Sequence, residues 1–222
     1  TTAMADEAIQ HMRQLKALAP EKPFFVYYVP GGTHAPHHPT PEWIKKIGDM
    51  KLFNDGWEKL RETIFANQKR LGIMPANAEL TPWPDGQEIY NGAKLPRWDS
   101  LSFEQKTLFI KQMEVYAAYQ AYTDHEIGRV IQAVEDLSQL DNTLIIYISG
   151  DNGASAEGMV NGTPNEFTTF NGIEVPVKDQ FLWYEFWGSE RTFPHFSAGW
   201  AWALDTPFKW MKQVPSHFGG TA

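Results

Sequence analysis

Two polar clusters in this sequence contain side chains that can do chemistry. The first is Asp151-Asn152, which offers a carboxylate and an amide oxygen. Both are hard oxygen ligands of the kind that Ca²⁺ or Mg²⁺ prefers. Followed by Gly153, the same pair is also typical of a β-turn. An apolar run ends directly before this pair, and that context adds weight to the metal-ligand interpretation, while the turn stays open as the alternative.

The second cluster is a loop with three histidines in five residues, His34, His37 and His38. Three interpretations remain open: loop histidines without a function, ligands of a transition metal, or hydrogen-bond donors to an anionic group in transfer. Pro36 and Pro39 stiffen the loop and point the rings in different directions. A single metal held by all three rings is therefore disfavoured.

The charge balance limits the classes of partner. The formal net charge is −8, which argues against nucleic acid because phosphate binding needs a positive face. A small anionic substrate stays possible, because a few local cations or a metal reverse the field inside a pocket. Lys209 and Lys212 are either solvated surface residues or point charges that meet such an anion. No cysteine is present, so thiol catalysis is excluded within this chain.

Two apolar runs must position these clusters. Residues 24–29 and 144–149 are continuous and β-prone, as in strands buried on both faces of a parallel sheet. Helical spacing of apolar residues predicts helices over 3–18 and 108–137. The order predicts an α/β fold with a mainly parallel sheet flanked by helices. Ligands of such sheets lie at the carboxyl ends of strands, so we expect both polar clusters at one edge.

The rest of the chain shows less periodicity. We expect one domain portion, residues 1–222, with irregular excursions at about 42–100 and 154–205. No apolar stretch approaches the roughly 20 residues of a membrane helix, and no signal peptide opens the chain. The compartment therefore stays unknown. Because Thr1 is not an initiator Met and leads straight into a helical pattern, we interpret the chain as a piece of something longer.

Five motifs in a fixed order resemble the type I sulfatases, formylglycine-dependent members of the alkaline phosphatase superfamily. They are the run 23–28, the Thr-His-Ala-Pro of 33–36, the helical segment 124–129, the strand and polar turn at 146–153, and the closing stretch 212–221. The resemblance spans about residues 3–221. It implies an incomplete sulfatase-like α/β fold, the central part of a catalytic domain.

The resemblance also implies roles for single residues. Asp151 and Asn152 match half of a divalent-metal site, usually of Ca²⁺. His34 matches the active-site histidine that contacts the sulfate ester and its leaving oxygen, and His37 is the alternative for that role. Lys212 matches the lysine that holds the sulfate group. We expect His34 and Asp151 to lie within about 12 Å, the reach of one small-ligand pocket.

The family's nucleophile lies in a Cys/Ser-x-Pro-x-Arg motif that this chain does not contain. The resemblance therefore implies that formylglycine and the other metal ligands come from an upstream segment, the remainder of the sulfatase chain. The isolated chain is expected to leave a small-molecule sulfate ester uncleaved and to bind Ca²⁺ weakly or not at all. Two alternatives remain: a phosphodiesterase or phosphonate hydrolase of the same superfamily, and a non-catalytic binding homologue.

Overall fold

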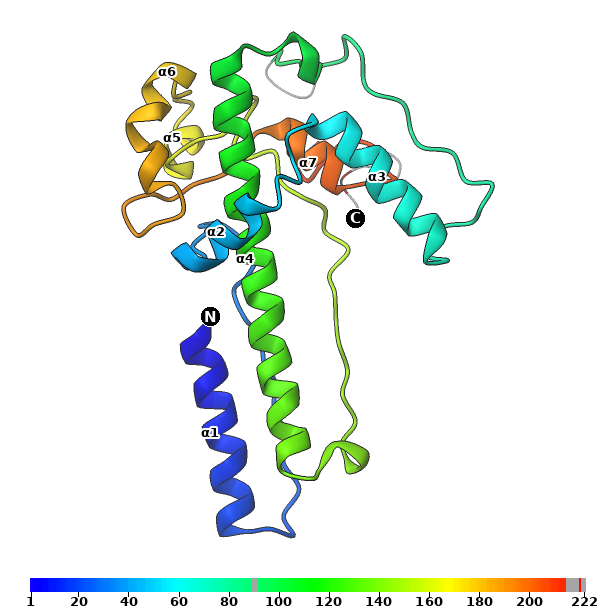
Figure 1. Ribbon diagram of the computed structural model, residues 1–222, viewed down its shortest axis with the longest axis vertical. Coiled ribbons are helices and arrows are strands. Elements are labelled where there is room, and N and C mark those ends of the chain that lie inside the picture. The colour runs from blue at the N-terminus through cyan, green and yellow to red at the C-terminus, as the bar shows by residue number, and fades with distance from the viewer. Residues whose placement is uncertain (89–91, 215–219, 221–222) are drawn as a thin grey trace.

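Two long helices dominate the fold (Figure 1). The computed structural model describes residues 1–88, 92–214 and 220. Helix α1 (Thr2–Leu18) and helix α4 (Phe103–Asp136) confirm the two predicted helices. Helix α4 begins five residues earlier than predicted because Ser102 and Gln105 form a capping box, in which each side chain satisfies the other's backbone N–H.

The upper half of α4 is embedded in a core that is rich in tryptophan (Figure 1). Helices α2 (Pro41–Asp49), α3 (Gly56–Arg70) and α7 (Ala198–Leu204) pack around it. We call this cluster the tryptophan core, and its buried tryptophans are Trp57, Trp98, Trp187, Trp200, Trp202 and Trp210. The short elements are η1 (Trp98–Ser100), η2 (Leu140–Asn142), α5 (Glu166–Phe170), α6 (Val177–Gln180) and η3 (Phe181–Phe186).

The lower half of α4 packs against α1 and forms a second, smaller apolar cluster. An ion pair also joins the two helices, with Asp6 accepting from the Arg129 guanidinium at 2.5 Å. We call α1, the lower half of α4 and the two extended segments beside them the lower region. The buried members of its cluster are Ala5, Ile9, Met12, Val130, Ala133 and Val134.

The parallel sheet that the sequence predicts is not formed within residues 1–88, 92–214 and 220. Segments 24–29 and 144–149 are extended, but they pair neither with each other nor with another described segment. In the described chain, β-type backbone pairing is limited to four isolated bridges elsewhere. An extended backbone needs N–H and C=O partners from a neighbouring strand, and these two segments do not supply them to each other.

Segment 24–29 is also not buried on both faces, as the continuous apolar run had predicted. Phe24, Val26 and Tyr28 pack against the α1–α4 cluster. Phe25 and Tyr27, which alternate with them, are 88% and 79% exposed. Such alternation is the period of a strand with one covered face. In segment 144–149 five successive residues are exposed: Leu144, Ile145, Ile146, Tyr147 and Ile148.

Across the described residues, no helix has both the length and the apolar character needed to cross a bilayer.

Candidate functional site

The loop after segment 144–149 is held against the C-terminal part of the described chain. The Lys212 backbone N–H donates to the Ala154 carbonyl at 2.9 Å, and the Gly153 N–H donates to the Gly220 carbonyl at 2.8 Å. The Ala154 N–H donates to the carboxylate of Asp205 at 2.5 Å. These bonds bring residue 212 beside the loop that begins at Asp151.

Asp205 is an unusual anchor for this loop because its side chain is fully buried. Burial raises the pKa of Asp205 to about 8, although the Ala154 N–H and the Arg61 guanidinium act in the opposite direction. Arg61 is itself buried and donates to the carbonyls of Thr81 and Phe208, at 2.7 and 3.0 Å. The loop is therefore fastened to a polar centre inside the tryptophan core.

Asp151 and Asn152 stand at the start of this loop, and both are exposed. Their donor set, one carboxylate and one amide oxygen, fits a share of a hard-cation site but falls short of the six to eight oxygens around Ca²⁺. The separation between His34 and Asp151 stays a prediction. Residues 215–219 and 221 of the expected closing motif lie outside the described residues.

The three loop histidines occupy different surroundings. His34 is exposed, and its Nδ1 lies 3.0 Å from the carbonyl oxygen of Ala35, the next residue in the chain. His37 is buried, stacks on Phe196 with ring centroids 5.4 Å apart, and meets the edge of Tyr116 at 4.9 Å. His38 places its Nε2 2.8 Å from the carbonyl oxygen of residue 192. Of the three, His34 is the one that solvent reaches most freely.

A fourth histidine, His195, lies beside His37 and was not predicted as a site residue from the sequence. It is 2% exposed, and its ring centroid lies 5.2 Å from that of His37. Burial lowers the pKa of His195 to about 4; the Glu157 carboxylate opposes this, while His34 and Lys212 add to it. Charged or polar groups from three distant segments therefore influence the pKa of one imidazole.

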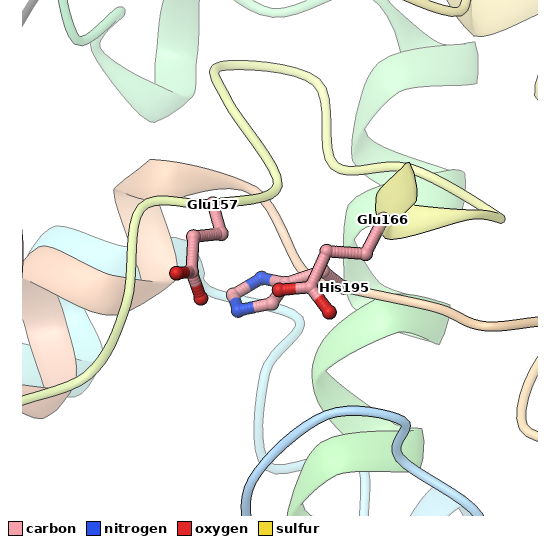
Figure 2. Close-up of side chains that lie close together, drawn as sticks. All are labelled: Glu157, Glu166 and His195. Atoms are coloured by element: carbon pink, nitrogen blue, oxygen red, sulfur yellow. The ribbon is translucent and has the colours of Figure 1, made fainter. Parts of the chain in front are cut away.

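Two glutamates lie next to this imidazole (Figure 2). Oxygens of Glu157 and Glu166 and a ring nitrogen of His195 all lie within 4.8 Å of one another. Glu166 is 3% exposed. Burial raises the pKa of Glu166 to about 7, and the neighbouring Glu157 carboxylate adds to the rise.

Short backbone bridges explain how two of these residues meet. Thr163 and His195 exchange both backbone hydrogen bonds, each 2.9 Å long. The Glu166 N–H donates to the Phe193 carbonyl at 2.8 Å. Helix α5 begins at Glu166, after Asn165 caps it through its side chain. Glu166 and His195 are thus fixed side by side although 29 positions separate them in the sequence.

Sequence reasoning missed Glu157, Glu166 and His195 because all three lie in the excursion 154–205, which has no period to place them. One signal was available. His195 sits between aromatic residues in a Phe-Pro-His-Phe run, and an ionisable side chain in such surroundings is expected to be buried with a partner.

The profile of the sulfatase family matches residues 1–185, which is most of the chain, and the chain belongs to this family. The family as a class has an alkaline phosphatase-like α/β fold, and its members are sulfate ester hydrolases that generally use a divalent metal.

Two relatives extend this finding. An uncharacterized sulfatase of Schizosaccharomyces pombe is 31% identical over 199 residues, covering 90% of this chain and 33% of that protein. An arylsulfatase of Klebsiella aerogenes is 26% identical over 208 residues, covering 93% of this chain and 40% of that protein. The chain therefore spans about a third to two fifths of the length of these relatives.

Proposed function

We propose that this chain supplies part of the active site of a sulfuric ester hydrolase that cleaves aryl sulfates. The observation that supports the proposal is the backbone hydrogen bond from Lys212 to Ala154, three residues after Asp151, in a chain of the sulfatase family whose His34 and Lys212 both lower the pKa of His195. The arylsulfatase relative supports the aryl substrate class. The parallel sheet expected for the family belongs to the same proposal, with segments 24–29 and 144–149 as two of its strands.

Lys212 and the polar pair Asp151-Asn152 act on the sulfate group in this proposal. Lys212 meets the sulfonyl oxygens as a point charge. Asp151 and Asn152 contribute oxygens to a site for Ca²⁺ or Mg²⁺, and such an ion, when bound, neutralises charge on the same sulfonyl oxygens. A formylglycine, supplied from outside residues 1–222, would provide the attacking hydroxyl. The chain alone then binds the anion without cleaving the ester.

His34 donates a proton or a hydrogen bond to the leaving oxygen in this proposal. Its exposure leaves the ring accessible to a substrate. His37 suits this role less well, because it is buried between Phe196 and Tyr116. Burial also lowers the pKa of His37 well below its ordinary value, so His37 stays uncharged at neutral pH.

The test compares His34→Ala with His37→Ala in the complete gene product that contains this chain. A general acid is worth roughly 10²–10⁴-fold in rate, so His34→Ala should lower kcat on phenyl sulfate by that factor. The loss should shrink on p-nitrophenyl sulfate, whose leaving group needs less protonation. His37→Ala should reduce the free energy of unfolding and leave the leaving-group dependence of kcat unchanged.

His11→Ala is the matched control, because His11 is an exposed histidine on α1 and should change neither quantity. A loss of leaving-group dependence in His37→Ala alone would transfer the role to His37. Turnover of bis(p-nitrophenyl) phosphate in preference to aryl sulfates would replace the proposal with the phosphodiesterase alternative. Binding of aryl sulfates without any turnover by the complete gene product would favour the non-catalytic homologue.

A further inference from the structure

The group formed by Glu157, Glu166 and His195 is separate in composition from the expected metal ligands Asp151 and Asn152. It combines one imidazole with two carboxylates whose ligand atoms lie within 4.8 Å of one another. Figure 2 shows the His195 ring between the two carboxyl groups. Hard cations prefer oxygen alone, whereas a mixed nitrogen and oxygen set suits Zn²⁺ and related transition metals.

The hydrogen bond of His195 fixes which ring nitrogen can bind a metal. Its Nδ1 lies 3.2 Å from the Phe196 carbonyl oxygen. A carbonyl oxygen only accepts, so Nδ1 carries the proton and donates. In the neutral ring the Nε2 atom then holds a free lone pair. A backbone carbonyl on the second nitrogen is the usual way in which a metal-binding histidine is oriented.

Glu166 provides the independent sign of a missing ligand. Its side chain is 3% exposed, and its Oε1 is buried and accepts no hydrogen bond from any described residue. A buried carboxylate oxygen without a partner is costly, so an unpaired oxygen facing a second carboxylate calls for a cation or a shared proton.

Glu157 is held in place by two hydrogen bonds, and its side chain stays partly accessible to solvent. The Ser155 hydroxyl donates to its Oε2 at 2.8 Å, and the Gln213 amide donates to its Oε1. Gly158 lets the loop approach closely, because a Cβ at this position would lie 2.0 Å from the Phe196 carbonyl oxygen and 3.0 Å from the His195 Nδ1. Glu157 is only half-buried, which leaves an entry path for an ion.

We propose that Glu157, Glu166 and His195 form a binding site for a divalent transition metal, with Zn²⁺ as the ion that fits best. The three side chains provide the three protein ligands of a tetrahedral site. The competing explanation is that one proton shared by the two glutamates, together with the charge of Lys212, neutralises the group. The charge of Lys212 lowers the pKa of both glutamates. A metal here would therefore lie near the residue proposed to hold sulfate.

The test measures metal binding by the chain itself, so it does not depend on sulfatase activity. Zn²⁺ is titrated calorimetrically into the wild-type chain and into Glu166→Gln, Glu157→Gln and His195→Gln, with far-UV circular dichroism to confirm folding. We expect one Zn²⁺ per wild-type chain and at least a tenfold weaker affinity in each variant, since even outer-shell changes cost about 10–100-fold. The half-buried position of Glu157 makes Glu157→Gln the variant least exposed to folding defects.

Two controls separate the new site from its surroundings. Glu190→Gln makes the same change at an exposed glutamate and should bind Zn²⁺ as the wild type does. Asp151→Asn should also keep the affinity, and excess Ca²⁺ should not displace the bound Zn²⁺. Co²⁺ should give a visible d–d absorption in the wild type that is lost in His195→Gln.

Three results would overturn the proposal. Equal Zn²⁺ affinity in the wild type and all three ligand variants, or no binding at all, would leave a proton-sharing carboxyl pair neutralised by Lys212. Loss of binding in Asp151→Asn with retention in Glu166→Gln would assign the metal to the Asp151-Asn152 pair. None of these results would affect the proposed sulfatase function, which is tested by kcat on aryl sulfates.

Discussion

The tryptophan core and the lower region both contain many large apolar residues, but these are buried in the first and largely exposed on the extended segments of the second. In the tryptophan core six tryptophans are buried, three of them on α3 and α7 and three in η1 and the loops that pack against the helices. In the lower region, two extended segments leave Phe25 and Leu144 88% and 85% exposed. Helices satisfy their backbone groups internally, whereas an extended segment depends on neighbouring strands. Apolar side chains of this chain are therefore not buried by their composition alone. The extended segments, whose backbone groups lack strand partners, leave theirs exposed.

The largest effect that we predict for this comparison is at Trp200. Its ring is fully buried among Phe53, Trp57 and Trp98, and its indole N–H donates to the Phe109 carbonyl at 2.8 Å. Trp200→Ala should lower the free energy of unfolding by about 3–5 kcal/mol, because it opens a large cavity. Urea denaturation followed by tryptophan fluorescence measures this. A loss below about 1 kcal/mol would mean that the tryptophan core is loosely packed.

A second prediction concerns the pH dependence of the same core. The pKa of Asp205 is raised from its ordinary value of 3.8 to about 8 by burial. Its contribution to stability is therefore complete below about pH 4 and is lost as the pH rises through 8. Between pH 5 and 7 this loss amounts to about 1.4 kcal/mol per pH unit, because the unfolded chain releases a proton that the folded chain keeps.

Asp205→Asn isolates this contribution, because the amide that it introduces cannot ionise, while the amide oxygen still accepts the Ala154 N–H. The variant should show a flatter dependence of unfolding free energy on pH than the wild type. Glu166, whose pKa is raised to about 7, acts in the same direction in both proteins, so the difference between them measures Asp205. Parallel pH profiles would show that Asp205 is ionised in the folded chain.

The smallest effect is expected in the lower region, and two adjacent residues test it. Phe25→Ala should change the free energy of unfolding by less than about 0.5 kcal/mol, as exposed positions do. Phe24→Ala should cost more than about 1 kcal/mol, because Phe24 packs against the α1–α4 cluster and loses buried apolar area. Equal and large losses at both positions would show that the exposed face is covered in solution.

The sequence predicted the helices well because their signals are local. The apolar spacing of 3–18 and 108–137 needs no distant partner, and α1 and α4 form where it indicates. The sheet needs contacts between segments more than 100 residues apart. The run 24–29 forms no paired strand within the described residues, and the prediction of burial on both faces was wrong, since both depend on what lies beside a segment.

The residues of the candidate site also separate into those with a local sequence signal and those that depend on long-range contacts. Asp151, Asn152, His34 and Lys212 were singled out because each belongs to a short motif, and their joint function stays a prediction. The cluster around His195 depends on bridges between residues 163–166 and 193–195, for which the aromatic excursion has no periodic signal. Glu166 and His195 come together only when α5 and the segment before α7 are in place.

The pairing of α1 with the lower half of α4 has a consequence for synthesis of the chain on the ribosome. Asp6 and Arg129, which join the two helices, are 123 positions apart. At about 5–20 residues per second, translation takes roughly 6–25 s to cover that interval. During this time the face of α1 that contains Ile9 and Met12 has emerged without its partner helix. The apolar face of α1 therefore stays uncovered until the second half of α4 has been synthesised.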